Sequence, residues 1–124
     1  MTTASWCVLI AGLLPYVATL TAKIGAGGFD NRNPRDWLAN QSGFRRRANF
    51  AQQNSFEAFP LFAAAVIIAQ LAGAPQARVD VLAITFVASR LLYIAFYVAD
   101  QSTLRSLAWF GGIGSAVAIF FAAA

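Results

Sequence analysis

The chain alternates between long apolar stretches and short polar ones, and this alternation predicts four membrane-spanning helices. The predicted spans cover approximately residues 6–22, 46–72, 79–99 and 105–123. A helix needs about 20 apolar residues to cross the hydrocarbon core of a bilayer, so each stretch is long enough. Short connections make successive helices run up-down-up-down. The predicted fold class is therefore all-α, an integral membrane four-helix bundle whose single domain covers residues 1–124.

The connections between the spans differ in length and composition. Residues 25–44 are polar, rich in glycine and contain Pro34, which predicts an irregular loop. A tight turn is predicted at residues 73–75 and a short connection at residues 100–103. A secretory signal peptide is the alternative interpretation of the first apolar stretch. No basic residue precedes that stretch and it is long, so we interpret it as a helix of the mature protein.

Composition supports lipid as the surroundings of the chain and narrows its chemistry. Hydrophobic residues make up 59% of the sequence and charged residues only 11%, against about a quarter in soluble domains. The absence of histidine removes the commonest general base and metal ligand. Cys7 is the only cysteine, so an internal disulfide is impossible and a thiolate metal cluster is not expected. We therefore predict no metal site.

The basic residues predict the orientation of the chain. Those in or beside the first and third connections are Lys23, Arg32, Arg35, Arg45, Arg46, Arg47 and Arg105. The opposite side has only Arg78. A net charge of +4 is compatible with nucleic-acid binding, but basic residues next to spans are typical of a topology signal. We therefore predict a multi-pass protein with these two connections in the cytoplasm, and no nucleic-acid partner.

Two ionisable residues lie well inside predicted spans. Glu57 follows Arg47 by ten residues and Arg90 precedes Asp100 by ten, so both lie roughly 15 Å below the same surface. Buried charges of this kind usually face the bundle interior and have a partner. Because the two helices are antiparallel neighbours, we predict that Glu57 and Arg90 form a charge pair.

Further polar residues extend this pair into a cleft that opens towards the cytoplasm. At helical spacing, one helix carries Arg47, Asn54 and Glu57. The facing helix carries Arg90, Tyr93 and Tyr97, and Arg105 begins the next helix. Arginine is a hydrogen-bond donor only, so the cleft suits an anion that brings its own reactive group, such as a thiol. The alternative is that these polar residues only tie the helices together.

Two motifs one helix apart resemble a known family. The run of residues 51–62 contains Asn54-x-x-Glu57-x-x-Pro60. The next helix contains Arg90-x-x-Tyr93-x-x-x-Tyr97, and Leu104-Arg105-Ser106 follows. In this order the motifs resemble those of the MAPEG family, the membrane-associated proteins of eicosanoid and glutathione metabolism. The resemblance extends over nearly the whole chain.

The resemblance implies a homotrimer with glutathione bound between neighbouring subunits near the cytoplasmic face. Matching positions imply glutathione contacts at Gln53, Asn54, Glu57, Arg90, Tyr93 and Tyr97. Arg105 would be the catalytic arginine that stabilises the thiolate. A lipophilic small molecule would enter from the membrane lipid. The implied function is a glutathione-dependent transferase or peroxidase acting on lipophilic electrophiles or hydroperoxides.

The chain also departs from the family pattern. Several members carry arginine where this chain has Phe50, and Arg47 is the nearest substitute as a glutathione ligand. Ala58 stands where some leukotriene-producing members have tyrosine. Residues 31–35 resemble the bacterial branch, which implies a bacterial inner membrane. The alternative functions are a non-catalytic scaffold that binds another small anion or an anionic lipid, and a small channel or transporter.

Overall fold

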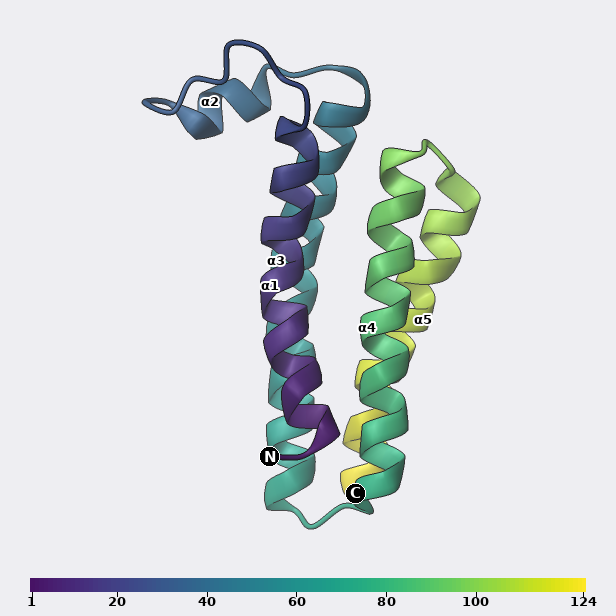
Figure 1. Cartoon of the computed structure of the whole chain (residues 1–124). Coiled ribbons are helices and arrows are strands. Elements are labelled where there is room, and N and C mark those ends of the chain that lie inside the picture. Colours follow the sequence, from purple (N-terminus) through teal and green to yellow (C-terminus); the bar gives the residue numbers. More distant parts are fainter.

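The computed structural model describes residues 1–124 and contains only helices. They are α1 (Thr3–Lys23), α2 (Pro34–Ala39), α3 (Gly43–Leu71), α4 (Gln76–Val98) and α5 (Ser102–Ala123). The four long helices run up, down, up and down, with α1 beside α3 and α4 beside α5, while α2 projects sideways at one end (Figure 1). All four are long and apolar enough to cross a membrane. The predicted all-α, four-helix membrane architecture is thus confirmed.

Each long helix begins three residues before its predicted span. The helices start at residues 3, 43, 76 and 102, whereas the apolar stretches start at residues 6, 46, 79 and 105. The difference arises because hydropathy marks the apolar part of a helix and passes over a polar first turn. In α1 that turn is closed by Thr2, whose hydroxyl accepts a hydrogen bond of 3.1 Å from the Ser5 N–H.

The connection between α1 and α3 contains the short helix α2, so the prediction of an irregular loop was wrong for residues 34–39, while residues 25–33 and 40–42 have no regular structure. Pro34 occupies its first turn, where the fixed φ of proline favours a helix start. Leu38 is buried against α1 and α3. Just before α2, Asp30 accepts hydrogen bonds from the Arg32 N–H and from Asn33, and these bonds hold the pKa of its carboxyl below the usual value.

Small residues fill most of the bundle interior, and many large apolar side chains point outward. At the centre, the rings of Phe62 on α3 and Phe86 on α4 stack in parallel with their centroids 3.9 Å apart. On the outer surface, Leu20 is 63% exposed and Phe121 is 72% exposed. Such a surface is unfavourable in water and suits a protein whose solvent is lipid.

Glycines allow α5 to pack closely on α4. A Cβ atom on Gly111 would lie 2.8 Å from the Oγ of Ser89, and one on Gly112 would lie 3.3 Å from the Cδ of Arg90. The two helices therefore approach each other closely here, as small residues commonly allow where helices pack in lipid.

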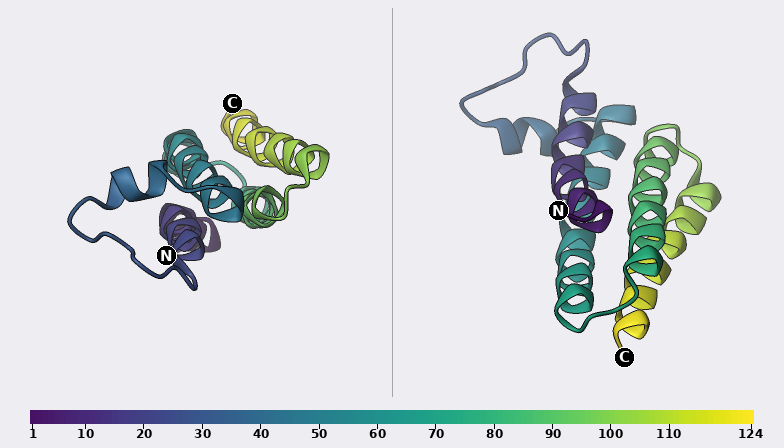
Figure 2. Two further views of the ribbon diagram at one scale, coloured as in Figure 1. Left: turned by 90° about the horizontal axis from the view of Figure 1, so that it is seen from above. Right: turned by 60° about the horizontal axis from the view of Figure 1, so that its bottom comes forward.

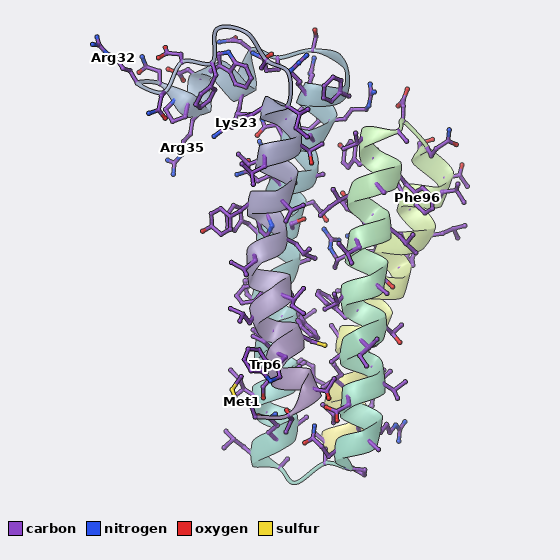
Figure 3. The ribbon with its side chains drawn as sticks, in the orientation of Figure 1. Met1, Trp6, Lys23, Arg32, Arg35 and Phe96 are labelled. Carbon is purple, nitrogen blue, oxygen red and sulfur yellow. The ribbon has the colours of Figure 1, made fainter.

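The two ends of the bundle differ in charge. Lys23, Arg32 and Arg35 gather at the end where α2 lies, while Met1 and Trp6 lie at the other end (Figure 3). We call the first of these the basic end. Seen along the bundle, α2 extends to the side of the α1–α3 pair that is remote from α5 (Figure 2).

Candidate functional site

Two adjoining pockets lie between α3, α4 and α5. The polar pocket, of about 290 Å³, is lined by Asn54, Tyr93, Tyr97, Arg105, Ser106, Trp109 and Phe110. The deep pocket, of about 160 Å³, is lined by Asn54, Glu57, Ala58, Leu61, Phe86, Arg90, Trp109, Ile113 and Ala116. Asn54 and Trp109 belong to both, so we treat the two pockets as one cleft with a polar part near the basic end and a more apolar part below it.

Arg90 is the buried charge of the cleft, with only 3% of its surface exposed. Its Nη2 donates hydrogen bonds to Oδ1 of Asn54 at 2.9 Å and to Oγ of Ser55 at 3.3 Å. The Nδ2 of Asn54 in turn donates to Oε2 of Glu57 at 3.3 Å. The predicted direct pair between Glu57 and Arg90 was therefore wrong. The neutral amide of Asn54 stands between them, and Glu57 lies on the exposed side of α3.

Local sequence explains this arrangement. Asn54 and Glu57 are three residues apart and share one face of α3, so the amide reaches the carboxylate without leaving its helix. Ser55 donates to the Ala51 carbonyl at 2.7 Å, which turns its oxygen lone pairs towards Arg90. Gly112 leaves room on α5 for the aliphatic part of Arg90. The arginine is thus held by all three helices of the cleft.

A series of arginine and tyrosine side chains leads from Arg90 towards the basic end. The Cζ of Arg90 lies 4.1 Å from the ring centroid of Tyr93. The Tyr93 and Tyr97 rings meet edge to face at 5.7 Å, and the Cζ of Arg105 lies 4.5 Å from the Tyr97 centroid. Cation–π contacts hold both guanidinium groups against these rings. Unlike that of Arg90, the guanidinium of Arg105 makes no hydrogen bond within the protein, so its N–H donors are free for an anion.

The structure does not bring Arg47 and Gln53 into this cleft. The Nε and Nη2 of Arg47 each donate to the Val98 carbonyl at 3.1 Å, where the end of α4 leaves carbonyls without helical partners. Gln53 precedes Asn54 by one residue, which turns it about 100° around α3. It lines a separate pocket beneath α2. The other predicted residues, Asn54, Glu57, Arg90, Tyr93, Tyr97 and Arg105, all line the cleft.

Phe50 occupies the position where the family resemblance led us to expect an arginine. Its ring centroid lies 6.4 Å from that of Tyr97, tilted by 49°. The Cζ of Arg46 lies 5.2 Å from the centroid of the Phe50 ring. The position therefore extends the aromatic wall beside the polar pocket and adds no hydrogen-bond donor there.

Trp109 lines both pockets and was not anticipated from the sequence. The signal that predicts it is spacing on α5, because Arg105, Trp109 and Ile113 follow one another at intervals of four residues and share one face. Like Asn54, it lies where the polar and deep pockets meet, with Arg105 in the polar pocket and Glu57 and Arg90 in the deep pocket.

The donor set of the cleft suits an anionic molecule with an apolar partner. Arg105 offers free donors, Glu57 offers a carboxylate and the deep pocket offers apolar walls. No group of three metal-ligating side chains comes together anywhere in the structure.

Comparison with known proteins gives one match. The family model described as MAPEG family matches residues 3–124, nearly the whole chain. No curated protein and no solved structure matches the chain.

Proposed function

The chain belongs to the MAPEG family, and on this premise we propose that it is a membrane-bound glutathione-dependent transferase or peroxidase. Its substrates are lipophilic electrophiles or hydroperoxides. The observation that carries the proposal is the free guanidinium of Arg105 beside a cleft whose polar and apolar parts meet at Trp109. An anionic thiol and a lipophilic acceptor can meet in such a cleft.

Glutathione presents a thiol, two carboxylates and an ammonium group, and the cleft has a partner for each kind. Arg105 directs its N–H donors towards the sulfur and favours the thiolate over the thiol. Glu57 has an oxygen that is free of hydrogen bonds within the protein and accepts one from the ammonium group. Arg90 and Asn54 are held by the hydrogen bond between them. Their role is to position the glutathione peptide, and they take no proton from its thiol.

The reaction proceeds by attack of the glutathione thiolate after its proton has left to solvent. In conjugation the sulfur forms a bond to an electrophilic carbon, and the leaving group departs with the displaced electron pair. In peroxide reduction the sulfur attacks the terminal oxygen, the O–O bond breaks, and the alkoxide that leaves takes a proton from solvent to become an alcohol. A second glutathione then converts the resulting sulfenic acid into glutathione disulfide and water.

The surroundings of Glu57 support the proposed homotrimer. Asn54 and Glu57 lie roughly 16 to 21 Å along α3 from Gly43, well inside the span. A carboxylate exposed to hydrocarbon at that depth is costly, whereas a neighbouring subunit and bound glutathione would cover it. With the basic end in the cytoplasm, as in the prediction from the charged residues, the polar pocket opens towards cytoplasmic glutathione.

A non-catalytic scaffold that binds another small anion is the second candidate. The observation that favours it is the lack of an arginine at Phe50 together with the engagement of Arg47 by the end of α4. Because neither Phe50 nor Arg47 offers a free donor, Arg105 is the only free cation that lines the polar pocket.

Calorimetry distinguishes the two candidates. The purified protein in detergent micelles is titrated with glutathione and with S-methylglutathione, and turnover is measured with chlorodinitrobenzene as the lipophilic acceptor. The enzyme binds glutathione at millimolar concentration or below and conjugates it to the acceptor. Binding of both peptides without turnover of the acceptor would show a glutathione-binding protein that is not a transferase. No heat with glutathione at millimolar concentration would rule out the enzyme and favour the scaffold that binds another anion.

A further inference from the structure

The deep pocket is small and has mostly apolar walls. It measures about 160 Å³, and six of its nine lining residues are apolar, namely Ala58, Leu61, Phe86, Trp109, Ile113 and Ala116. A cavity of about 150 Å³ with aliphatic and aromatic walls stays dry and admits a molecule of the size of benzene. The deep pocket therefore has room for about one aromatic ring.

The polar lining residues of the deep pocket lie where it meets the polar pocket. Asn54 lines both pockets and is hydrogen-bonded to the other two, Arg90 and Glu57. Arg105, whose donors are free for the glutathione sulfur, lines the polar pocket, and Trp109 lines both. A group that the sulfur carries or attacks can therefore extend past Asn54 and Trp109 into the apolar part of the deep pocket.

The deep pocket is closed on the side that is remote from the basic end. About one helical turn further along α3 and α5, Ala65 and Ile119 have no exposed surface and belong to the hydrophobic core. The ring of Phe86, which lines the pocket, is held by stacking on Phe62 with centroids 3.9 Å apart. Since protein interiors leave few voids, a bound group cannot continue along the bundle axis.

Two side chains on α5 limit the size of the pocket. Ala116 lies roughly 10 Å further along α5 than Trp109, and Ile113 lies between them. The single methyl group of Ala116 leaves space in the pocket, whereas the branched side chain of Ile113 occupies some of it. A longer side chain at the first position would fill the pocket, and a shorter one at the second would extend it.

We propose that the deep pocket selects acceptors by size, and that Ile113 and Ala116 set the limit. The pocket admits a substituent of about one aromatic ring on the atom that the sulfur attacks, and it excludes fused rings. This inference rests on the proposed glutathione-dependent function and adds the class of acceptor, which is compact arylalkyl electrophiles such as benzyl halides. With benzyl chloride the thiolate sulfur forms a bond to the benzylic carbon, and chloride leaves with the electron pair of the broken C–Cl bond.

The test is calorimetric titration of the purified protein with glutathione derivatives that carry a methyl, a benzyl or a 2-naphthylmethyl group on sulfur. Burial of a ring between apolar walls is favourable, so S-benzylglutathione binds about tenfold or more tightly than S-methylglutathione. The 2-naphthylmethyl derivative binds no more tightly than the benzyl derivative, although it is more apolar. The values of kcat/KM for benzyl chloride and 2-(chloromethyl)naphthalene, each divided by the rate without enzyme, follow the same order.

Variants of α5 change this order in opposite directions. Ile113→Ala enlarges the pocket, so the affinity for the 2-naphthylmethyl derivative rises relative to that for the benzyl derivative. Ala116→Leu fills the pocket, so the benzyl derivative loses its advantage over the methyl derivative. The matched control is Val117→Ala, which shortens an exposed side chain of the same helix outside both pockets and leaves the order unchanged. Affinity for glutathione itself stays constant in all three variants.

Several results would overturn the size selection. Tighter binding of the 2-naphthylmethyl derivative by the unmodified protein would mean that the group leaves the cleft sideways between Leu61 and Trp109, which are both exposed. Equal affinities for the methyl and benzyl derivatives would show that the substituent does not enter the deep pocket. The same change of order in Val117→Ala and Ile113→Ala would assign the effect to α5 in general. In each case glutathione still binds and the proposed function stands. A protein that neither binds nor conjugates glutathione would instead contradict the proposed function, and the size selection with it.

Discussion

The Oδ1 of Asn54 lies 2.9 Å from the Nη2 of Arg90, and the Nδ2 of the same amide lies 3.3 Å from Glu57. The Asn54 amide thus accepts a hydrogen bond from the Arg90 guanidinium and donates one to the Glu57 carboxylate. A direct ion pair at this depth would require both charges to lose their hydration. With the amide between them, Arg90 is satisfied inside the bundle and Glu57 remains available at its surface.

Asn54→Leu is expected to lower the free energy of unfolding by about 2 kcal/mol, because it leaves the buried guanidinium of Arg90 without its shortest hydrogen bond. Denaturant titration in detergent micelles measures this change. Asn54→Asp keeps an acceptor oxygen beside Arg90 and is the matched control, with a smaller loss. Equal stabilities of the leucine and aspartate variants would mean that the contact with Asn54 contributes nothing to the bundle.

Arg47→Ala is expected to destabilise the protein by about 1–2 kcal/mol without changing its affinity for glutathione. The variant removes both hydrogen bonds to the Val98 carbonyl at the end of α4. Arg46→Ala deletes the neighbouring positive charge and leaves that carbonyl capped, so it separates the capping role from the general charge of the basic end. Calorimetry with glutathione provides the second measurement. A weaker affinity confined to Arg47→Ala would return this residue to the binding site.

Arg105→Ala is expected to lower kcat/KM for thiol conjugation by about 10- to 100-fold, the range for loss of one charge-stabilising donor. Without the guanidinium the pKa of bound glutathione rises, so the loss is greatest near neutral pH and shrinks as pH increases. The pH profile of kcat/KM and the ultraviolet absorbance of the bound thiolate report this shift. Arg105→Lys restores part of the rate, and Arg32→Ala serves as the charge control. A uniform loss at every pH would argue against a role at the sulfur.

The sequence was sufficient to predict the four helices, because lipid imposes both a minimum length and an apolar surface on any helix that crosses it. The predicted starts of the helices were three residues late, because the polar first turns give no hydropathy signal. The short helix α2 was missed because six residues carry too little periodicity to distinguish a helix from a loop.

The sequence predicted how deep the candidate site lies below the membrane surface, but only some of the contacts within it. Equal distances from the membrane surface brought Glu57 and Arg90 to the same level, and both do contact Asn54. Spacing along α3 cannot say which neighbour a flexible guanidinium selects, so the amide between the two charges was not foreseen. For the same reason, the hydrogen bonds of the flexible Arg47 side chain to the end of α4 were not foreseen. Contacts made by long side chains depend on packing that the linear pattern does not contain.

Trp109→Ala is expected to widen the range of acceptors, because the indole lines both the polar and the deep pocket and its loss enlarges the space where they meet. The relative kcat/KM for a bulky lipophilic acceptor over chlorodinitrobenzene increases in this variant, while the affinity for glutathione changes little. Trp109→Phe retains an aromatic ring at the junction and keeps the wild-type ratio. If both variants lose activity equally towards all acceptors, Trp109 supports the fold of the cleft and does not select the substrate.

Phe50→Arg is expected to tighten glutathione binding. The Phe50 ring lies beside Tyr97, at the edge of a polar pocket that has Arg105 as its free cation. A second guanidinium there can donate charge-assisted hydrogen bonds to a glutathione carboxylate, which corresponds to about tenfold in Kd. Phe50→Leu removes the ring without adding a donor and isolates the cost of the lost aromatic contact.

The gain in affinity of Phe50→Arg should shrink as salt concentration rises, because salt screens charges in a pocket that is open to water. A gain that appears equally in Phe50→Leu would show that the ring merely obstructs the pocket. No gain in either variant would mean that the peptide does not reach this wall, and the assignment of the carboxylates would then move to Arg90.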